Sequence, residues 1–302
     1  MRLLLTGAWA EARAHISALE DRGHRVRFLQ QEAEPLPCPE DWVEDVVCNG
    51  LFLHHPLEDF PNLRYIQLTS AGLDRVDLNQ IRARDIRLFS ARGVYSVPMA
   101  EFALGGLLQL CKQSRFFLEN QRAHRWEKQR GLRELFGAQA LILGCGSVGN
   151  ECARRLGAFG CRVRGVDLYP RQDPLYEAML PLSALEAQLP QADILILTLP
   201  LTPETRGLLN EARLAVMKPG ALLVNIARGG LVDQEALIQA LERGPLGGAV
   251  LDVFETEPLA ADSPLWDLEN VILSPHNSFV GGGNAGRLSR LILDNLDREG
   301  AL

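Results

Sequence analysis

Residues 140–171 read ALILGCGSVGNECARRLGAFGCRVRGVDLYPR, and this stretch decides the fold of the chain. A short apolar run at 140–143 is suited to a buried strand, and the turn GCGSVG at 144–149 follows it at once. Residues 150–159 have helical spacing, and 162–166 reads as a second strand that ends at Asp167. A strand, a glycine-rich turn, a helix and a second strand form the setting in which G-x-G-x-x-G binds a dinucleotide. The stretch therefore predicts a dinucleotide-binding βαβ unit.

Each glycine of the turn meets a separate requirement. Gly144 allows the tight turn, Gly146 lets the backbone approach a pyrophosphate, and Gly149 lets the helix pack closely on its strand. The N–H groups at the start of the helix attract phosphate. We therefore expect these three glycines, with Ser147 and Val148, to bind the cofactor. A glycine-rich turn without a ligand is the alternative, which the flanking strands and the acid at 167 disfavour.

The acid that follows the second strand bears on which dinucleotide is bound. Asp167 lies eighteen residues after Gly149, where a carboxylate can accept hydrogen bonds from both ribose hydroxyls. A 2′-phosphate there would meet like charge, so NAD is favoured over NADP. Arg171 lies close enough along the chain to weaken that preference.

Composition excludes several classes of protein. The 302 residues suffice for two domains, and a net charge of −7 gives no electrostatic reason to expect nucleic acid or an anionic membrane as a partner. The six cysteines contain no C-x-x-C and no metal-ligand spacing, so we expect no metal site and a reducing, cytoplasmic location. No apolar stretch approaches the length of a membrane span.

Strand and helix patterns alternate along the rest of the chain and predict the α/β class. Residues 1–95 resemble a small α/β domain, and successive βα units after Asp167 imply a parallel sheet with helices on both faces. The predicted strands of this second sheet include 221–226, 248–253 and 270–274.

A long helix is predicted from Ser96 to about Asn120. It is apolar nearly all round and contains small residues, so most of its surface must be covered. Burial between domains would cover it, as would a subunit interface; we favour a homodimer in which 96–120 is the dimerisation helix.

A turn in the first domain is a candidate anion site. Ser70, Ala71 and Gly72 follow a predicted strand at its carboxyl end, where open α/β sheets bind ligands. Their N–H groups could hold a small anion, but a plain turn from strand to helix fits the sequence equally well.

Three ionisable residues follow the ends of three consecutive predicted strands: Arg228, Glu257 and His276. The carboxyl ends of parallel strands lie on one edge of the sheet, so we expect these residues to gather beside the glycine turn. Arg228 can pair with a carboxylate, His276 can exchange a proton near neutral pH, and Glu257 can hold the imidazolium. Each residue taken alone could equally be structural. Their joint position predicts a catalytic site.

Over nearly its full length the chain resembles the D-isomer-specific 2-hydroxyacid dehydrogenases, which are NAD-dependent oxidoreductases. The matching segments are QLTSAGLDRVD (67–77), AEF (100–102), LILGCGSVG (141–149), LPLTPET (199–205), VNIARGGLVDQEAL (224–237), GGAVLDVFETEPL (247–259) and SPH (274–276).

The resemblance implies a role for particular residues. The catalytic Arg, Glu and acid/base His fall on Arg228, Glu257 and His276. The substrate carboxylate would meet Arg228 and the backbone of Ser70, Ala71 and Gly72. The cofactor would be lined by His276, by the nicotinamide-side carboxylate Asp252, and by Thr198, Leu199, Pro200 and Ala227.

The resemblance also implies the domain plan. A discontinuous substrate domain, residues 1–95 plus 280–302, would be hinged to a central Rossmann domain, residues 96–279, both with parallel Rossmann-like or flavodoxin-like sheets. Closure between them would exclude water from the path of the hydride.

Alternatives remain open at this stage. The same fold serves cofactor-sensing corepressors, against which the intact Arg-Glu-His set argues, and it serves formate- or phosphite-oxidising enzymes. Thr198 stands where many relatives carry His, and Asn277, Ser278 and Phe279 follow the predicted catalytic His where smaller or aliphatic residues are commoner. These departures leave the side chain of the 2-hydroxy acid undetermined.

Overall fold

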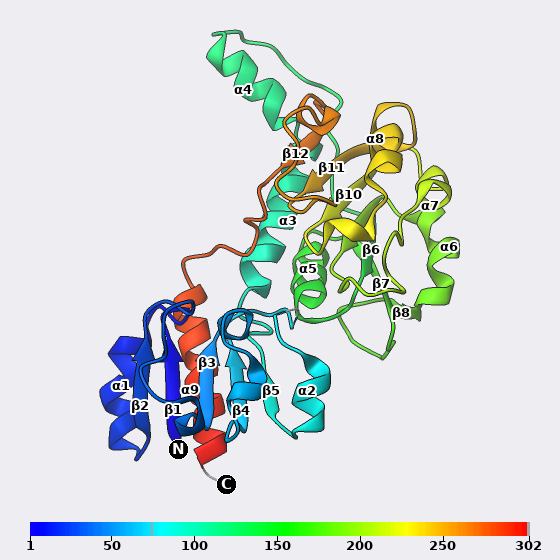
Figure 1. Cartoon of the computed structure of the whole chain (residues 1–302). Coiled ribbons are helices and arrows are strands. Elements are labelled where there is room, and N and C mark those ends of the chain that lie inside the picture. Colours follow the sequence, from blue (N-terminus) through cyan, green and yellow to red (C-terminus); the bar gives the residue numbers. More distant parts are fainter. Residues whose placement is uncertain (74, 301–302) are drawn as a thin grey trace. The chain divides into compact units, whose positions relative to one another are not determined.

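The computed structural model describes residues 1–73 and 75–300, and the chain divides into two compact units. Unit 1 comprises residues 1–95 together with 281–302, and unit 2 comprises residues 96–280 (Figure 1). Position 74, inside the segment QLTSAGLDRVD, and positions 301–302, at the end of the expected substrate domain, lie outside the described residues. Among the described residues, none of the helices is both long enough and apolar enough to cross a membrane.

Unit 1 is built on a five-stranded parallel sheet in the order β2-β1-β3-β4-β5. This is the flavodoxin-like strand order, whose ligand crevice lies at the carboxyl ends of the strands. The strands are β1 (Arg2–Thr6), β2 (Arg25–Leu29), β3 (Asp45–Cys48), β4 (Tyr65–Leu68) and β5 (Arg87–Phe89), and the helices are α1 (Ala12–Asp21), α2 (Leu78–Ala83) and α9 (Asn284–Gly300).

Helix α9 brings the C-terminal part of the chain into the core of unit 1. Its residues Leu288, Ile292 and Leu296 recur at helical spacing and are buried with β1 and α1. Two buried side-chain hydrogen bonds also reach α9 from the N-terminal segment. Trp9 Nε1 donates to Ser289 Oγ at 2.8 Å, and Asn295 Nδ2 donates to Gln67 Oε1 at 2.8 Å. Unit 1 is therefore discontinuous in sequence.

Unit 2 contains a seven-stranded parallel sheet in the order β12-β11-β10-β9-β6-β7-β8. Reading outward from β6, this is the doubly wound order of a Rossmann fold, with its switch point between β6 and β9. Helices α3 and α5 cover one face, and α6, α7 and α8 cover the other. The strands are β6 (Gln139–Leu143), β7 (Arg162–Asp167), β8 (Ala178–Pro181), β9 (Ile194–Leu197), β10 (Ala221–Asn225), β11 (Leu246–Leu251) and β12 (Val271–Leu273), and the helices are α3 (Ser96–Cys111), α4 (Ser114–Arg122), α5 (Ser147–Ala158), α6 (Leu185–Gln188), α7 (Glu211–Ala215) and α8 (Gln234–Glu242).

The prediction of one continuous helix over 96–120 is wrong. The chain forms α3 and α4, which are separated at Gln113, whose φ of 51° places it in the left-handed region. That conformation ends an α-helix, and it costs a non-glycine residue on the order of 1 kcal/mol. Neither glycine nor proline marks the break, so the sequence pattern did not reveal it. Helix α3 packs on the sheet at Gly106, where a Cβ would lie 2.6 Å from Val250 Cγ1.

Candidate active site

The glycine turn has no room for a side chain at two of its positions, Gly144 and Gly149. Gly144 has φ 97°, and a Cβ on it would lie 2.7 Å from the backbone nitrogen of Leu199. A Cβ on Gly149 would lie 2.1 Å from the carbonyl oxygen of Gly144. Helix α5 begins at Ser147, three residues earlier than the sequence predicts, with Gly146 as its N-cap. The turn thus delivers the helix N-terminus directly to the sheet edge, with Ser147 and Val148 half-buried in the first turn.

Thr198, the residue directly after β9, supports the same turn. The Thr198 hydroxyl lies 2.5 Å from the Gly144 carbonyl oxygen and 3.1 Å from that of Leu143, so it donates to this pair of acceptors. The Thr198 hydroxyl therefore ties the end of β9 to the glycine turn. Leu199 is buried behind it and Pro200 is exposed at the rim.

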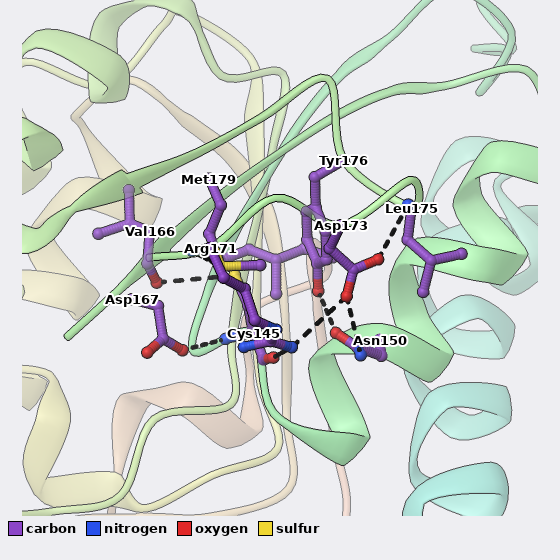
Figure 2. A network of polar contacts seen from close by, with 10 residues as sticks. Cys145, Asn150, Val166, Asp167, Arg171, Asp173, Leu175, Tyr176 and Met179 are labelled. Atoms are coloured by element: carbon purple, nitrogen blue, oxygen red, sulfur yellow. Dashed lines mark hydrogen bonds and ion pairs between the residues drawn. The ribbon is translucent and has the colours of Figure 1, made fainter. Parts of the chain in front are cut away.

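Asp167 ends β7 and faces the glycine turn (Figure 2). Its Oδ2 accepts a hydrogen bond from the Cys145 N–H at 2.7 Å, and its Oδ1 accepts one from the Tyr169 N–H at 2.9 Å. Each oxygen retains a second lone pair for a ribose hydroxyl. The carboxylate thus anchors the turn and keeps acceptor capacity on both of its oxygens.

Arg171 approaches the turn from the other side. Its Nη2 donates to the Cys145 carbonyl oxygen at 2.8 Å and lies 3.5 Å from Asp173 Oδ2 (Figure 2). Cys145 itself is buried, and burial raises the pKa of its thiol to about 12. The thiol therefore stays protonated at neutral pH and packs as a small apolar group, despite its place near a helix N-terminus.

The structure brings Glu257 and His276 together. They follow β11 and β12, which are adjacent and parallel, and Glu257 Oε2 lies 2.8 Å from His276 Nδ1. Glu257 is held in turn through its Oε1, which accepts the Phe254 N–H at 3.1 Å. Both side chains keep access to solvent, at 43% for His276 and 37% for Glu257. A ligand can therefore reach the imidazole at its other nitrogen.

Arg228 lies beyond the end of the neighbouring strand β10. Its side chain is exposed, and its Nη1 donates to the Ala227 carbonyl oxygen at 2.7 Å. A hydrogen bond from Arg228 to Glu257 or His276 is not among the contacts of the described residues. The two loops nevertheless pack backbone to backbone, because a Cβ on Gly229 would lie 1.9 Å from the Phe254 carbonyl carbon. Arg228 thus sits beside the loop that carries Glu257.

The turns bearing Arg228 and His276 are closed by two buried side chains. Asn225 Oδ1 accepts the Ala227 N–H at 3.1 Å, and Asn225 Nδ2 donates to the Arg228 carbonyl oxygen at 3.1 Å. The Asp252 carboxylate accepts the N–H groups of Asn277 and Ser278. The sequence singled out Asp252 only through the family resemblance and missed Asn225, although an amide that ends a buried apolar strand was a signal.

In unit 1, the turn Ser70-Ala71-Gly72 follows β4 at its carboxyl end, as the sequence predicts. Ser70 Oγ donates to the Gly72 carbonyl oxygen at 3.1 Å, and the Ser70 carbonyl oxygen accepts the Ala91 N–H at 2.8 Å. The Ala71 residue is exposed. These contacts fix the shape of the turn and leave Ala71 accessible to a ligand.

The residues at the switch point fit a dinucleotide. A turn with no room for a Cβ at Gly144 or Gly149, a helix of twelve residues that begins at that turn, and a carboxylate at the end of the next strand are the parts that such a ligand needs. An acid–imidazole pair and a guanidinium lie at the carboxyl edge of the same sheet. Fold and site together define a dinucleotide-dependent oxidoreductase.

Comparison with known proteins narrows this class. Residues 104–278 match the family described as D-isomer specific 2-hydroxyacid dehydrogenase, NAD binding domain. Over 244 residues the chain is 37% identical to (S)-sulfolactate dehydrogenase of Chromohalobacter salexigens, covering 80% of this chain and 79% of that protein. It is 34% identical over 244 residues to glyoxylate reductase of Korarchaeum cryptofilum, covering 79% and 74%. A solved structure of a family member from Aeromonas salmonicida subsp. salmonicida superposes with a TM-score of 0.82 at 32% identity, covering 98% of this chain and 96% of that one.

The chain belongs to the D-isomer specific 2-hydroxyacid dehydrogenases. It is an NAD-dependent oxidoreductase that transfers a hydride between NAD(H) and a small 2-oxo or 2-hydroxy acid. This confirms the predicted fold class, family and cofactor. The corepressor alternative is not favoured, because the relatives that match are named as dehydrogenases.

Proposed function

We propose that the chain catalyses the reduction of a small 2-oxo acid to the D-2-hydroxy acid through Arg228, Glu257 and His276. The observation that carries this proposal is the 2.8 Å contact between Glu257 Oε2 and His276 Nδ1. A carboxylate on Nδ1 fixes the tautomer and the orientation of the ring, and it leaves Nε2 for the substrate.

Side chains of this protein would transfer the proton and bind the substrate carboxylate. NADH, when bound, would supply the hydride. His276, as imidazolium, donates its Nε2 proton to the carbonyl oxygen of the substrate as negative charge develops there. Arg228 presents a fork of N–H donors to the substrate carboxylate and holds the keto acid in a fixed orientation. In the reverse direction His276 accepts the proton of the hydroxyl group.

Unit 1 is proposed as the substrate domain, with residues 280–302 completing residues 1–95, and 96–279 is proposed as the NAD-binding domain. The turn Ser70-Ala71-Gly72 would bind the substrate carboxylate through its N–H groups. Its place at the carboxyl end of β4 in a flavodoxin-like sheet supports this assignment.

Within the cofactor site, we propose that Asp167 confers a preference for NAD over NADP. Its carboxylate is held by two backbone N–H groups and would face the ribose hydroxyls. Alongside the glycine turn, Thr198, Leu199, Pro200, Ala227, Asp252 and His276 are proposed to line the cofactor.

The test is a screen of 2-oxo acids with NADH oxidation as the readout. Glyoxylate, hydroxypyruvate, pyruvate and branched and aromatic 2-oxo acids should separate by kcat/KM. The variant His276→Ala should lower kcat by about 100-fold on the best substrate, while the exposed His54→Ala serves as its control. Arg228→Ala should lower kcat/KM further still, with the exposed Arg243→Ala as control. Full activity in His276→Ala would remove the imidazole from the mechanism.

We also propose that the chain acts as a homodimer, and we assign it to the cytoplasm because none of its six cysteines is in a disulfide. One face of α3 supports dimerisation: Phe102 and Leu108 are only half-buried, and the space beside Gly105 is open. The segment 112–134 carries seven Lys and Arg against three Glu in a chain of net charge −7, and it exposes Trp126 at 97%. A second copy offers both apolar cover and a complementary charge.

Sedimentation measurements test the dimer. Phe102→Glu should yield monomers, whereas Val216→Glu, at an exposed apolar position after α7, should leave the association unchanged. A monomeric parent protein at micromolar concentration would refute the proposal.

A further inference from the structure

Two polar side chains are buried at the ends of adjacent strands, next to the proposed catalytic residues. Asn225 ends β10 and is 2% exposed, and Asp252 follows β11 and is 0% exposed. Burying an amide or a carboxylate is costly unless hydrogen bonds replace those made to water. The hydrogen-bond partners of the two side chains therefore indicate which parts of the backbone they fix.

Asn225 closes the turn that carries Arg228. Its oxygen accepts the Ala227 N–H and its nitrogen donates to the Arg228 carbonyl oxygen, each at 3.1 Å. The side chain thereby fixes the backbone on both sides of the residue that we assign to the substrate carboxylate. The guanidinium itself makes no bond to Asn225 among the described contacts.

Asp252 closes the turn that carries His276. Its Oδ1 accepts the Asn277 N–H at 2.7 Å and the Ser278 N–H at 3.1 Å, and its Oδ2 lies 3.1 Å from the same Ser278 nitrogen. Its carbonyl oxygen also accepts the His276 N–H at 2.8 Å. Three successive backbone N–H groups, from His276 to Ser278, are therefore bonded to one residue.

The backbone of His276 needs such support. Its φ of 52° lies in the left-handed region, which costs a side-chain-bearing residue on the order of 1 kcal/mol and persists only where the surroundings impose it. The three N–H bonds to Asp252 impose it here. They set the direction in which the imidazole leaves the chain, toward Glu257.

The two anchors are joined to each other. The Asp252 N–H donates to the Asn225 carbonyl oxygen at 3.0 Å, which continues the pairing of β10 with β11 beyond its last strand residues. The separation between the two turns is thus fixed by main-chain bonds.

We propose that Asn225 and Asp252 are positioning residues, Asn225 for Arg228 and Asp252 for His276. This inference rests on the proposed roles of Arg228 and His276. It assigns to each buried side chain a separate part of the reaction. Asn225 serves the binding of the substrate carboxylate, and Asp252 serves the transfer of the proton.

Two nearly isosteric variants separate these parts. Asn225→Asp keeps an acceptor for the Ala227 N–H but replaces the donor to the Arg228 carbonyl oxygen by a carboxylate oxygen. We expect the KM for the 2-oxo acid to rise about tenfold, with an unchanged pH profile of kcat. In Asp252→Asn the amide oxygen can replace only one of the two carboxylate oxygens, and an NH2 group at the position of Oδ2 would face the Ser278 N–H, whose nitrogen lies 3.1 Å from that oxygen. We expect kcat to fall about 100-fold, with little change in KM for the acid.

The pH profile supplies a readout that a general loss of stability does not move. Because Asp252 is proposed to act on the residue that transfers the proton, the pH profile of kcat should change in Asp252→Asn and remain that of the parent in Asn225→Asp. KM and the shape of a pH profile do not depend on the fraction of enzyme that is folded, so both readouts also serve a destabilised variant. If Asp252→Asn does not accumulate as folded protein, Asp252→Glu is measured with the same expectation.

The exposed Asp262→Asn is the matched control and should behave as the parent enzyme. If Asn225→Asp and Asp252→Asn change KM and kcat alike and leave the pH profile unmoved, the proposal is wrong. A tenfold loss of NADH affinity by fluorescence titration in Asp252→Asn, with kcat and its pH profile intact at saturating NADH, would also overturn it, because Asp252 would then act on cofactor binding alone and not on His276. Full activity in Arg228→Ala and His276→Ala would instead refute the proposed function itself.

Discussion

Asp45 provides a stability test that is independent of catalysis. It begins β3 in the middle of the sheet of unit 1, is 1% exposed, and has no hydrogen-bond partner for either carboxylate oxygen in the part of the chain that the structure describes. Burial raises the pKa of this carboxyl to about 6 from its ordinary value of 3.8, against the opposing attraction of Arg64. The folded protein therefore carries a carboxylate that would be more stable in water.

The magnitude and sign follow from linkage. A pKa of about 6 in the folded state against 3.8 in the unfolded chain corresponds to about 3 kcal/mol, at roughly 1.36 kcal/mol per pKa unit. Because the folded state binds the proton more tightly, this destabilisation is absent below pH 3.8, grows as pH rises, and is complete above about 6. Asp45→Asn removes the charge and keeps the shape. It should raise the free energy of unfolding by up to about 3 kcal/mol at pH 7.5.

Urea unfolding at pH 7.5, 6.0 and 5.0, followed by tryptophan fluorescence, measures the effect, since Trp9 is buried in unit 1. The gain from Asp45→Asn should shrink steadily as the pH falls. The exposed Asp59→Asn is the control and should show no comparable gain. A gain that is equal at all three pH values, or no gain at pH 7.5, would refute the assignment of a buried, charged carboxyl.

Three further substitutions, one of them with a matched control, test the cofactor site and the loop that carries Arg228. In helix α5, Gly149→Ala should weaken NADH binding and lower the melting temperature, because the new Cβ would lie 2.1 Å from the Gly144 carbonyl oxygen. The control in the same helix, Gly157→Ala, adds its Cβ in open space and should stabilise the protein by about 0.5–1 kcal/mol. Equal effects of the two substitutions in calorimetry would contradict this account. Gly229→Ala should lower kcat/KM by about tenfold or more, because the new Cβ would push apart the loops that carry Arg228 and Glu257. Unchanged kinetics would show that this packing is dispensable. Asp167→Ala should reduce the ratio of kcat/KM with NADH to that with NADPH; a parent enzyme that already uses both equally would rule out the carboxylate argument.

The pairing of Glu257 with His276 could be predicted because it depends only on strand direction. Apolar runs bounded by turn residues mark β11 and β12, and parallel neighbours must deliver the loops after them to the same edge of the sheet. The glycine turn could be predicted for a similar reason. The spacing of its glycines predicts positions without room for a side chain, and Gly144 and Gly149 do approach neighbouring backbone too closely for a Cβ.

Other features depend on tertiary contacts that leave no local pattern. The break at Gln113 lies in a polar stretch without glycine or proline, and a left-handed residue there is stabilised by surroundings that the sequence does not specify. The edge strand β8 has only four residues, none of them fully buried, so it shows neither an apolar run nor clear alternation. The bonds made by Asn225 and Asp252 could not be foreseen, because the sequence marks a polar residue at a strand end but not the N–H groups that it will meet.

The discontinuity of unit 1 has a consequence for biosynthesis. Its core is completed by Leu288, Ile292 and Leu296 of α9, whereas unit 2 is a single continuous segment. Domains generally fold as units while the chain emerges from the ribosome. Unit 2 can therefore acquire its final structure during translation. The N-terminal residues of unit 1, although synthesised first, cannot complete their core until α9 has emerged. Nascent chains arrested before α9 should resist protease in the central segment and remain digestible at their beginning.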